Sequence, residues 1–333
     1  MTGLITPPSG AAHARISGIG AYRPRRVVPN SELVEAIDSS DEWIQERSGI
    51  KTRHFAGDGE SVIDMSEFAT RDALAMAGIE AGEVDAVILA TVTHPYQTPA
   101  AAPALADRMG MGKPAAFDIS AACAGYCHGI SLASDMVRGG SARNVAVVGV
   151  ERLSDFTSRT DRGTAFIFGD GAGAAIVTAS DTAGIGPTVW GSEGDKWDVI
   201  AQNESWIDVH EQKLDWPTIG MQGQRVFRWA VWSMAPVAQR ALEVAGVTVD
   251  QLDAFIPHQA NVRIIDAMCK QLKMPDHVAV ARDIVDSANT SAASVPLATE
   301  RMLREGAAPR GGLALQIGFG AGLSYAAQVI TLP

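Results

Sequence analysis

AGIEAGEVDAVI, at residues 77–88, is echoed by AGVTVDQLDAFI at residues 245–256. Both strings run from Ala-Gly and an aliphatic residue through a turn to Asp-Ala and an apolar strand. Two Gly-rich turns that enter Ala-rich strands, FIFGDGAGAAIV (166–177) and QIGFGAGLSYAAQVI (316–330), lie about 150 positions apart. The two pairs indicate a duplicated α/β unit whose equivalent strand ends meet at a pseudo-two-fold axis, where ligands favour the crevice beyond the strand carboxyl ends. Chance similarity between Ala- and Gly-rich strings is the alternative for either pair alone.

Apolar β-branched runs alternate with Ala-rich helical stretches along the chain. VDAVILATV (84–92) and NVAVVGV (144–150) predict buried strands, and residues 66–77 and 129–137 predict helices. This alternation is typical of an α/β protein with helices on both faces of its sheet. The length of 333 residues suggests about two folding units. Because no low-complexity or Pro/Ser-rich linker separates them, we expect the units to pack intimately.

The composition disfavours several classes of function. There are 27 Lys and Arg against 38 Asp and Glu, a net charge of −11 and a pI near 5.1, which disfavours a general nucleic-acid or anionic-membrane surface. No apolar run approaches the roughly 18 residues of a membrane span, and the N-terminal MTGLITPPSGAAHAR has neither a charged leader nor a long apolar stretch. Three cysteines in so long a chain indicate reduced thiols. We therefore expect a soluble, cytoplasmic protein without a nucleic-acid or membrane partner.

The first candidate for chemistry is Cys123, in AFDISAACAGYCHGI (116–130). A strand-like run precedes it and a helical pattern follows, so the thiol is predicted at a strand-to-helix turn. Free helix N–H groups and the helix dipole lower a thiol pKa and favour the thiolate that acyl transfer needs. The alternative is a buried, inert cysteine. A metal site that includes Cys127, His128 and Cys269 is disfavoured, because structural zinc sites show closer cysteine pairs and four ligands.

Two further candidates stand where strands are predicted to end in the second half. FIPHQANVRI (255–264) places His258 after an apolar strand and before a helix. ANTSAASVP (288–296) places Asn289 between a strand-like DIVDS and a helix of small residues, where a lone Asn is usually a helix cap. With Cys123 they form a Cys-His-Asn constellation. Cysteine proteases also use one, but a papain-like enzyme carries its Cys near the mature N-terminus in a CGSCW-like setting that this chain lacks.

GDGAGA (169–174) matches the GxGxxA dinucleotide fingerprint only nominally. That motif requires a strand before it and a helix after it, whereas AAIVT (174–178) continues as a strand. We interpret these glycines as positions of close backbone packing, and we expect no nicotinamide, flavin, metal or other cofactor.

Several long strings in order resemble the β-ketoacyl-acyl-carrier-protein synthase III family of the thiolase superfamily, from about residue 15 to residue 333. They are SSDEWIQERSGI (39–50), ISAACAGY (119–126), DRGTAFIFGDGAGA (161–174), IPHQANVRI (256–264), NTSAASVP (289–296) and GFGAG (318–322). The resemblance implies a duplicated, five-layered αβαβα thiolase-like fold and usually a homodimer. Its halves would be residues 1–180, with the nucleophilic cysteine, and residues 181–333, with the histidine and asparagine.

The resemblance also implies the first condensation of dissociated fatty-acid synthesis. An acyl-CoA starter and malonyl-acyl-carrier protein give a β-ketoacyl-carrier protein, CO2 and CoA, so CoA thioesters are substrates rather than cofactors. The alternatives are a carrier-binding relative that has lost the chemistry, and another thiolase-superfamily reaction such as a hydroxymethylglutaryl-type condensation or ester formation.

The family's motifs then assign roles to the candidates. Cys123 attacks the starter thioester and holds the acyl group. His258 and Asn289 donate to the malonyl thioester oxygen, where negative charge develops during decarboxylation, and such donors are worth roughly 3 to 4 kcal/mol each. The backbone N–H groups of Cys123 and Ala321 stabilise the acyl tetrahedral intermediate. Members commonly carry Gly at the position of Ala321; the N–H survives that change, but the conformational freedom of Gly does not.

By the same resemblance, Trp43 and Arg47, at i and i+4 on one helix face, lie around the CoA adenine. Further positions that line the pantetheine tunnel are matched by Arg162, Gly223, Phe227 and Asn261. From the residues alone, Trp43 is as well explained by core packing and Arg162 by a surface ion pair.

An acidic carrier protein is repelled by a chain of this net charge, so its docking requires a local basic patch. Arg263 and Lys270 are seven residues apart, within about 20° of each other around a helix, and Arg225 and Arg228 begin another helical run. These residues match the family's carrier-docking positions in part, with Gln271 where many members have a second lysine. The alternative is a solvated basic face without a partner.

Thr98, in THPYQTPAAAP (93–103), predicts the choice of starter. Members restricted to a two-carbon starter often carry a bulky aromatic residue here, and the segment reaches the partner subunit's acyl pocket. Each extra buried methylene stabilises binding by roughly 0.8 kcal/mol, so we expect starters longer or more branched than acetyl. This holds unless Tyr96, Gln97 or the Trp-rich stretch 190–216 refills the space. The alternative is that Thr98 only packs at the dimer interface.

Overall fold

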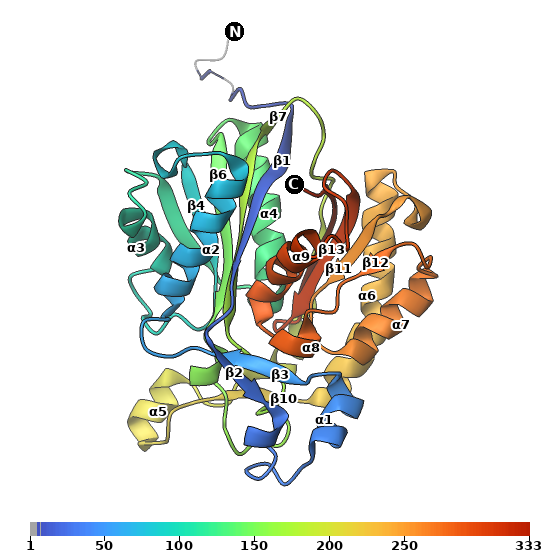
Figure 1. Cartoon of the computed structure of the whole chain (residues 1–333). Coiled ribbons are helices and arrows are strands. Elements are labelled where there is room, and N and C mark those ends of the chain that lie inside the picture. Colours follow the sequence, from blue (N-terminus) through green and yellow to red (C-terminus); the bar gives the residue numbers. More distant parts are fainter. Residues whose placement is uncertain (1–4, 7) are drawn as a thin grey trace.

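The computed structural model describes residues 5, 6 and 8–333; residues 1–4 and 7, in the N-terminal stretch where no leader is expected, lie outside it. Two five-stranded sheets form its centre (Figure 1). The first sheet has the order β1-β7-β6-β4-β5, from β1 (His13–Tyr22), β4 (Ala86–Ala90), β5 (Ala115–Ile119), β6 (Asn144–Glu151) and β7 (Gly171–Ser180). The second has the order β12-β11-β13-β14-β8, from β8 (Val189–Ser192), β11 (Ala254–Pro257), β12 (Ala279–Val280), β13 (Leu313–Gly320) and β14 (Ser324–Thr331).

The two sheets repeat one pattern of strand directions. β5, β4 and β6 run parallel, as do β12, β11 and β13. In each sheet the next two strands, β7 and β1 or β14 and β8, are antiparallel to their neighbours. β4 and β11 are the strands that end the two echoed strings, so the echo marks equivalent strands of the two sheets. The second echo holds only for β7 and β14, because residues 166–167 form a turn whereas residues 316–320 belong to β13.

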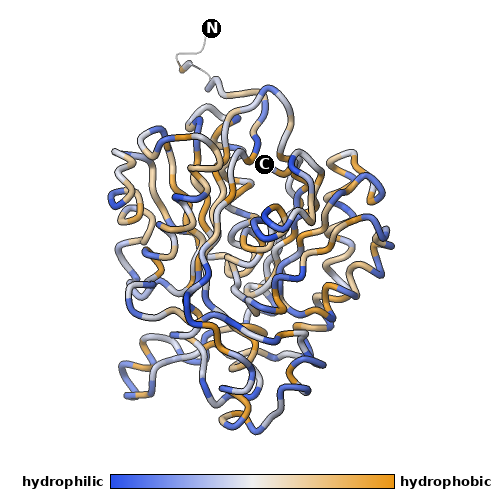
Figure 2. The backbone as a smooth tube through the Cα atoms, viewed as in Figure 1, coloured by the Kyte–Doolittle hydropathy of each residue, from blue (hydrophilic) through white to orange (hydrophobic). Residues whose placement is uncertain are grey.

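Helices separate and cover the sheets, which gives five layers. α4 (Gly125–Gly139) and α9 (Ser294–Arg304) lie between the two sheets and share one apolar core with both. α2 (Val62–Ala77) and α3 (Ala101–Arg108) cover the outer face of the first sheet, and α6 (Gly223–Ala245) and α7 (Val262–Leu272) cover that of the second (Figure 1). In Figure 2 the hydrophobic stretches of the tube concentrate in these layers, with hydrophilic loops outside them. The duplicated αβαβα arrangement is confirmed.

The predicted strands and helices are confirmed with shifted ends. Residues 84–92 and 144–150 correspond to β4 and β6, and the two predicted helices lie within α2 and α4. α2 begins at Val62 because Ser61 caps it: Ser61 Oγ accepts from Asp64 N at 3.2 Å, and the Asp64 carboxylate accepts from Ser61 N at 2.9 Å. β7 ends at Ser180 and β8 starts at Val189, and the division into residues 1–180 and 181–333 stays a prediction.

DIVDS (283–287) does not form the expected strand. It forms α8 (Ile284–Ser287), which follows β12 at the edge of the second sheet. Asp283 is buried, and its carboxylate lies 2.8 Å from the guanidinium groups of both Arg23 and Arg301. An extended segment would carry this carboxylate away from its two partners, so the buried ion pairs favour the helical turn.

The interpretation of GDGAGA as a close-packing motif is confirmed. β7 runs on through AAIVT without a helix. A Cβ on Gly173 would lie 2.6 Å from Pro296 Cβ at the start of α9, and a Cβ on Gly169 would lie 2.5 Å from the carbonyl oxygen of Ser287. Glycine is therefore required where β7 contacts α9 and where the segment before β7 contacts α8.

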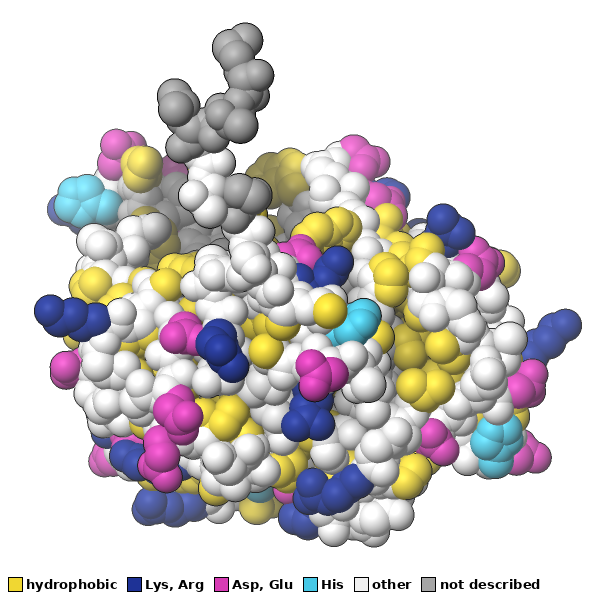
Figure 3. Space-filling view, turned by 90° about the horizontal axis from the view of Figure 1, so that it is seen from above, with side chains coloured by type: hydrophobic (Ala, Val, Ile, Leu, Met, Phe, Trp, Pro, Cys, Tyr) yellow, Lys and Arg dark blue, Asp and Glu magenta, His cyan; other side chains and the backbone are white. Residues whose placement is uncertain are grey.

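A smaller region lies below the sheets in Figure 1. It consists of β2 (Arg26–Pro29), α1 (Asp41–Ser48), β3 (Thr52–Phe55), β9 (Ile200–Gln202), α5 (Trp206–Gln212) and β10 (Ile219–Met221). The opposite face, seen from above in Figure 3, carries acidic and basic side chains interspersed. Within the described part of the chain, no helix is both long and apolar enough to cross a membrane.

Candidate active site

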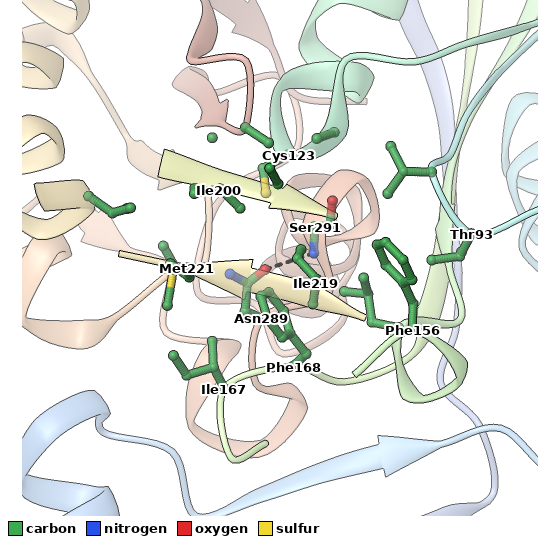
Figure 4. Close-up of a pocket in the computed structure, with 18 of the residues that line it drawn as sticks. Thr93, Cys123, Phe156, Ile167, Phe168, Ile200, Ile219, Met221, Asn289 and Ser291 are labelled. Atoms are coloured by element: carbon green, nitrogen blue, oxygen red, sulfur yellow. Dashed lines mark hydrogen bonds between the residues drawn. The ribbon is translucent and has the colours of Figure 1, made fainter. Parts of the chain in front are cut away.

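A cavity of about 2050 Å³ opens at the carboxyl ends of the parallel strands. Its walls include the segments that follow β4, β5, β11 and β13, at residues 91–97, 120–123, 258–264 and 321–322. β9 and β10 supply apolar side chains from the smaller region, and Figure 4 shows several of these around Cys123 and Asn289. The crevice expected from the duplication is therefore the cavity of this molecule.

Cys123 lies in the turn between β5 and α4, as predicted. A short 3-10 helix, η3 (Ala122–Ala124), joins the two elements, and Ala122 has a φ of +42°. This left-handed backbone costs a non-glycine residue roughly 1–2 kcal/mol, a kind of strain that clusters at active sites. The turn aims the cysteine into the cavity, which it lines.

The expected low pKa of the Cys123 thiol is wrong. Burial raises this pKa to about 11; the Glu151 carboxylate also raises it, whereas hydrogen bonds from the Ser291 side chain and from the backbone N–H groups of Cys123 and Ala321 lower it. The sequence shows a helix start, but it does not show how far the sulfur is removed from water. The thiol is thus protonated at neutral pH.

His258 follows β11 and is 2% exposed. The backbone N–H of His258 donates to the carbonyl of Ile317 at 2.7 Å, and the ring nitrogen Nδ1 lies 2.6 Å from Ser294 Oγ. The ring of Phe319 packs edge-on against the imidazole, with centroids 5.4 Å apart. Burial lowers the pKa of His258 to about 3, so the ring is neutral. Because Nδ1 is engaged by Ser294, Nε2 is the nitrogen left for a ligand in the cavity.

Asn289 is held by its backbone and by its side-chain oxygen. Its N–H donates to the carbonyl of Ile167 at 2.9 Å, and its Oδ1 accepts from the N–H of Ser291 at 2.8 Å (Figure 4). This is an Asx-type turn rather than the usual helix cap, since the residue before α9 is Ala293. With Oδ1 occupied, the two N–H donors of Nδ2 are available to the cavity.

The loop after β13 closes over the cysteine. A Cβ on Gly320 would lie 2.7 Å from both Cβ and Sγ of Cys123, so only glycine allows this approach. Ala321 follows, and its nearby backbone N–H acts to lower the pKa of the Cys123 thiol. Ala321 is not among the residues with positive φ. Alanine in place of the glycine common in the resembled family therefore costs no backbone strain here.

Trp43 and Arg47 lie on α1, which begins after the N-cap Ser40. The guanidinium carbons of Arg47 and Arg162 lie 5.6 and 4.9 Å from the centre of the Trp43 ring. Phe166 packs edge-on against the same ring at 5.4 Å. One end of the cavity therefore presents an aromatic face between two exposed cations, a suitable surface for a base with attached phosphates.

Asn261 joins α1 to α7. Its Nδ2 donates to the carbonyl of Arg47 at 2.8 Å, and its Oδ1 caps α7 by accepting from the N–H of Arg263 at 2.9 Å. The Arg263 guanidinium lies 5.2 Å from the centre of the Phe227 ring on α6, the helix that Gly223 begins. The cavity thus brings together all ten residues predicted for catalysis and CoA binding, which are Cys123, His258, Asn289, Ala321, Trp43, Arg47, Arg162, Gly223, Phe227 and Asn261.

Comparison with known proteins supplies the family. Residues 117–194 match the family model described as 3-oxoacyl-[acyl-carrier-protein (ACP)] synthase III, and residues 242–332 match the model of its C-terminal part. A β-ketoacyl-[acyl-carrier-protein] synthase III from Streptomyces coelicolor is 59% identical over 99% of each chain, and one from Mycobacterium avium is 49% identical over 99% of this chain and 98% of its own.

The chain belongs to the β-ketoacyl-[acyl-carrier-protein] synthase III family. Among solved structures, the priming β-ketosynthase from the R1128 polyketide biosynthetic pathway matches it with a TM-score of 0.97 and 47% identity over 99% of each chain. A 3-oxoacyl-[acyl-carrier-protein] synthase III from Aquifex aeolicus matches with a TM-score of 0.88 and 37% identity over 96% of this chain and 99% of its own. The protein is a condensing acyltransferase with the thiolase fold.

The four basic residues predicted for carrier docking are exposed on α6 and α7 of this synthase. Arg228 and Arg263 line the cavity, whereas Arg225 and Lys270 lie outside its lining. Arg225 lines a smaller cleft of about 310 Å³ beside it. Across residues 5, 6 and 8–333, no ion pair involves any of the four, so their charges are not neutralised within the chain.

Thr98 is exposed, and the cavity of a single chain is lined by its neighbours His94 to Gln97 and by Ala100 but not by Thr98 itself. Its predicted contact is with the partner subunit, so its role in the acyl pocket stays a prediction.

Sequence reasoning missed several polar residues of this synthase's site, among them Ser291 in the cavity wall and Glu151, which accepts a hydrogen bond from Ser291. Glu151 ends the otherwise apolar strand NVAVVGVE (144–151), and a carboxylate in that position is a signal that could have been noticed. Ser291 was hidden in the string of small residues after Asn289. Apolar wall residues, among them Phe156, Phe168, Ile200, Ile219 and Met221, were likewise not predicted.

The other two cysteines do not belong to the site. Cys127, on α4, is buried beneath Gly318 of β13, and burial raises the pKa of its thiol to about 12. His128 stacks on Trp190, with ring centroids 5.6 Å apart, and Cys269 lies on α7. Among the residues that the structure describes, no group of three or more His, Cys, Asp or Glu is arranged to hold a metal ion.

Proposed function

We propose that this synthase condenses an acyl-CoA starter with malonyl-acyl-carrier protein through an acyl-Cys123 intermediate. The observation that carries the proposal is the convergence of Cys123, His258 and Asn289 on one cavity, whose other end presents Trp43 between two guanidinium groups. Cys123, His258 and Asn289 can perform the chemistry of both half-reactions, acyl transfer and condensation. Trp43 and the two guanidinium groups can bind the nucleotide of CoA.

In the first half-reaction, the sulfur of Cys123 attacks the starter thioester. Negative charge develops on the carbonyl oxygen, and the backbone N–H groups of Cys123 and Ala321, which both favour negative charge at the sulfur, stabilise it. The carbon–sulfur bond of the CoA thioester then breaks, and CoA leaves as the free thiol, so the proton lost by Cys123 is balanced by the one that CoA gains. Splitting the condensation in this way replaces one difficult step with two easier ones.

In the second half-reaction, the malonyl group loses CO2 and the electron pair forms an enolate. Nε2 of His258 and Nδ2 of Asn289 donate to its oxygen. Nδ1 of His258 lies 2.6 Å from the Ser294 hydroxyl, and burial keeps the ring neutral. For Nε2 to donate to the enolate, the ring proton must lie on Nε2, and the Ser294 hydroxyl is then the donor to Nδ1. The enolate carbon attacks the acyl carbonyl, and the bond to the Cys123 sulfur breaks.

The test is to separate the two half-reactions. Wild-type protein incubated with acyl-CoA should gain the acyl mass on Cys123, and Cys123→Ser should gain none. His258→Ala and Asn289→Ala should still be acylated but should release CO2 from malonyl-carrier protein at least 100-fold more slowly, following the cost of roughly 3 kcal/mol per donor. Equal loss of acylation in all three variants contradicts the division of roles, and an unlabelled wild type indicates a non-catalytic carrier-binding relative.

We propose initiation of type II fatty-acid synthesis as the enzyme's use. The likeness to a priming β-ketosynthase of a polyketide pathway, with a TM-score of 0.97, supports chain initiation and favours polyketide priming as the second candidate. Both uses share the chemistry and differ in the carrier protein accepted. Values of kcat/KM with malonyl groups on a fatty-acid and on a polyketide carrier protein distinguish them.

A homodimer is part of the proposal. β5 is an edge strand of the first sheet, and Phe117 on it is 37% exposed. Tyr96, in the segment that carries Thr98, is 67% exposed. A second subunit on this edge would cover both rings and bring the Thr98 segment to the partner subunit's acyl pocket. The starter is then longer or more branched than acetyl, because threonine leaves room there.

The acidic carrier protein docks on the basic face of α6 and α7. Arg225, Arg228, Arg263 and Lys270 are exposed there without ion pairs in the described chain, and two of them border the cavity. On the face seen from above in Figure 3, acidic and basic side chains are interspersed. A carrier arm entering beside Arg228 and Arg263 reaches the cysteine through the same cavity as CoA.

A further inference from the structure

Arg53, on β3, is a fully buried arginine that takes no part in the two half-reactions. Its Nη1 donates to the carbonyl of Val28 at 3.2 Å, and its Nη2 donates to Oδ1 of Asn30 at 2.7 Å and to the carbonyl of Phe166 at 2.9 Å. Burial lowers the pKa of the guanidinium to about 10 and the Asp41 carboxylate acts against this, so the group is charged at neutral pH. A buried charge held by uncharged acceptors is costly, so the three segments that Arg53 joins give the better account of its use.

Asn30 carries the contact from Arg53 to α1. Its Nδ2 donates to Oδ1 of Asp41 at 2.6 Å. Asp41 is the first residue of α1, and its other oxygen accepts from Nε2 of Gln45, one turn further along the helix, at 2.8 Å. Two consecutive hydrogen bonds therefore fix the start of α1, and with it Trp43, relative to the buried guanidinium.

The contact of Arg53 with the Phe166 carbonyl fixes a second element, the turn at residues 162–167. This turn supplies two side chains that meet the Trp43 ring. The Arg162 guanidinium lies 4.9 Å from the centre of the ring, and Phe166 packs edge-on against it at 5.4 Å. One buried group thus holds both elements whose side chains converge at the end of the cavity proposed for the nucleotide.

We propose that Arg53 is a positioning residue for the nucleotide of CoA, which holds α1 and the turn at residues 162–167 in the one arrangement where Trp43 and Arg162 bind the base and its phosphates together. This rests on the proposed function. Arg53 does not line the cavity, so it acts on the substrate only through these two elements. Lysine cannot replace it, because a single ammonium group lacks the planar fork that reaches acceptors on several segments at once.

The test is the dissociation constant of CoA, measured by titration calorimetry on the whole protein, together with the rates of Cys123 acylation by acyl-CoA and by a short thioester that lacks the nucleotide. Arg53→Lys should weaken CoA binding and raise the KM for acyl-CoA by up to about tenfold, the effect expected when stacking on the base is lost. It should leave kcat and the rate with the short thioester unchanged. A general disturbance of the active site would instead slow both thioesters.

A double-variant cycle shows whether Arg53 acts through Trp43. Trp43→Ala removes the ring that Arg53 is proposed to position. In that background, Arg53→Lys should weaken CoA binding by less than about twofold, because residues that act as a unit have non-additive effects. Independent contributions would multiply.

Asp41→Ala tests the same connection from the protein surface, where the side chain is half-buried. It removes the acceptor of Asn30 and should also weaken CoA binding, by about threefold or more if a hydrogen bond to a charged group is lost. Glu42→Ala is the matched control. It removes the same kind of charge from the first turn of α1, but its side chain is exposed and makes no hydrogen bond or ion pair within the described part of the chain, so CoA binding should match wild type.

Circular dichroism and thermal unfolding check that each variant is folded, and where Arg53→Lys is not, Asp41→Ala and Glu42→Ala decide the outcome. CoA affinity within about twofold of wild type in the folded Arg53→Lys and Asp41→Ala variants overturns the proposal. Equal slowing with both thioesters, multiplied losses in the double variant, or an equal loss in Glu42→Ala overturns it as well. If CoA binding weakens as expected but wild type acquires no acyl group, the proposed function fails and the positioning role stands.

Discussion

Replacing Gly320 with alanine should separate catalysis from folding at this site. The new Cβ would meet Cβ and Sγ of Cys123 at 2.7 Å, whereas ordinary contact begins at 3.4 Å, so the two must part by at least 3.4 − 2.7 = 0.7 Å. A misplacement of about 1 Å costs roughly 100-fold in a well-positioned reaction. We therefore expect acylation of Cys123 to slow by about two orders of magnitude, or about 2.7 kcal/mol of activation free energy.

The assay is the rate at which intact protein gains the acyl mass from acyl-CoA, measured well below the melting temperature because overpacking also destabilises by about 1–3 kcal/mol. Gly82→Ala is the matched control, since a Cβ there meets no atom within 4 Å. Acylation of Gly320→Ala within about threefold of wild type would refute the reasoning. So would an equal loss in Gly82→Ala.

Four further outcomes are expected. Trp43→Ala should raise the KM for acyl-CoA about tenfold, since stacking on a base is worth roughly 1–3 kcal/mol, and should not affect a short thioester that lacks the nucleotide. Burial raises the pKa of Asp170 in the folded protein from 3.8 to about 6, so the free energy of unfolding of wild type should fall by up to about 3 kcal/mol between about pH 4 and pH 6. Asp170→Asn has no carboxyl group to ionise there, so its stability relative to wild type, measured by urea denaturation, should increase over the same range. Arg225→Glu with Lys270→Glu should raise the KM for malonyl-carrier protein but not for acyl-CoA, and the difference should shrink at high salt because both side chains are exposed. Thr98→Phe should shift the ratio of kcat/KM values from branched or medium-chain acyl-CoA toward acetyl-CoA, and an unchanged ranking would count against the acyl-pocket assignment.

The sequence was most informative where function depends on backbone placement. The strand-to-helix turn at Cys123, the strand end before His258 and the start of α7 at Asn261 all follow from local patterns of apolar residues, turns and caps. Parallel strands bring such ends to one edge of a sheet. Local patterns therefore predicted that Cys123 lies near His258 and Asn261, which follow it by 135 and 138 positions in the chain.

The sequence was least informative where the surroundings of a side chain determine its pKa or its local fold. The low thiol pKa expected for Cys123 came from the helix start, an effect of at most about 2 kcal/mol. Burial acts in the opposite sense and prevails. How deep a side chain lies is set by residues distant in the chain, such as Gly320 and Ser291, and no local window contains them. The fold of DIVDS was mispredicted for the same reason, because the partners of Asp283 are Arg23 and Arg301.

The duplication places two equivalent turns, at residues 122–124 and 291–293, in contact with the strands of the opposite half. Glycines at equivalent positions of the two central strands each abut the turn of the opposite half: a Cβ on Gly149 would lie 2.2 Å from the carbonyl oxygen of Ala292, and a Cβ on Gly318 would lie 2.9 Å from that of Cys123. Each half thus packs its strand against the other half's turn, and the backbone geometry of one fixes the position of the other. Ala292 occupies the place that corresponds to Cys123, so the second half has the turn without a nucleophile. Its preceding residue, Ser291, instead supplies the hydroxyl that donates to Glu151 and the N–H that orients Asn289.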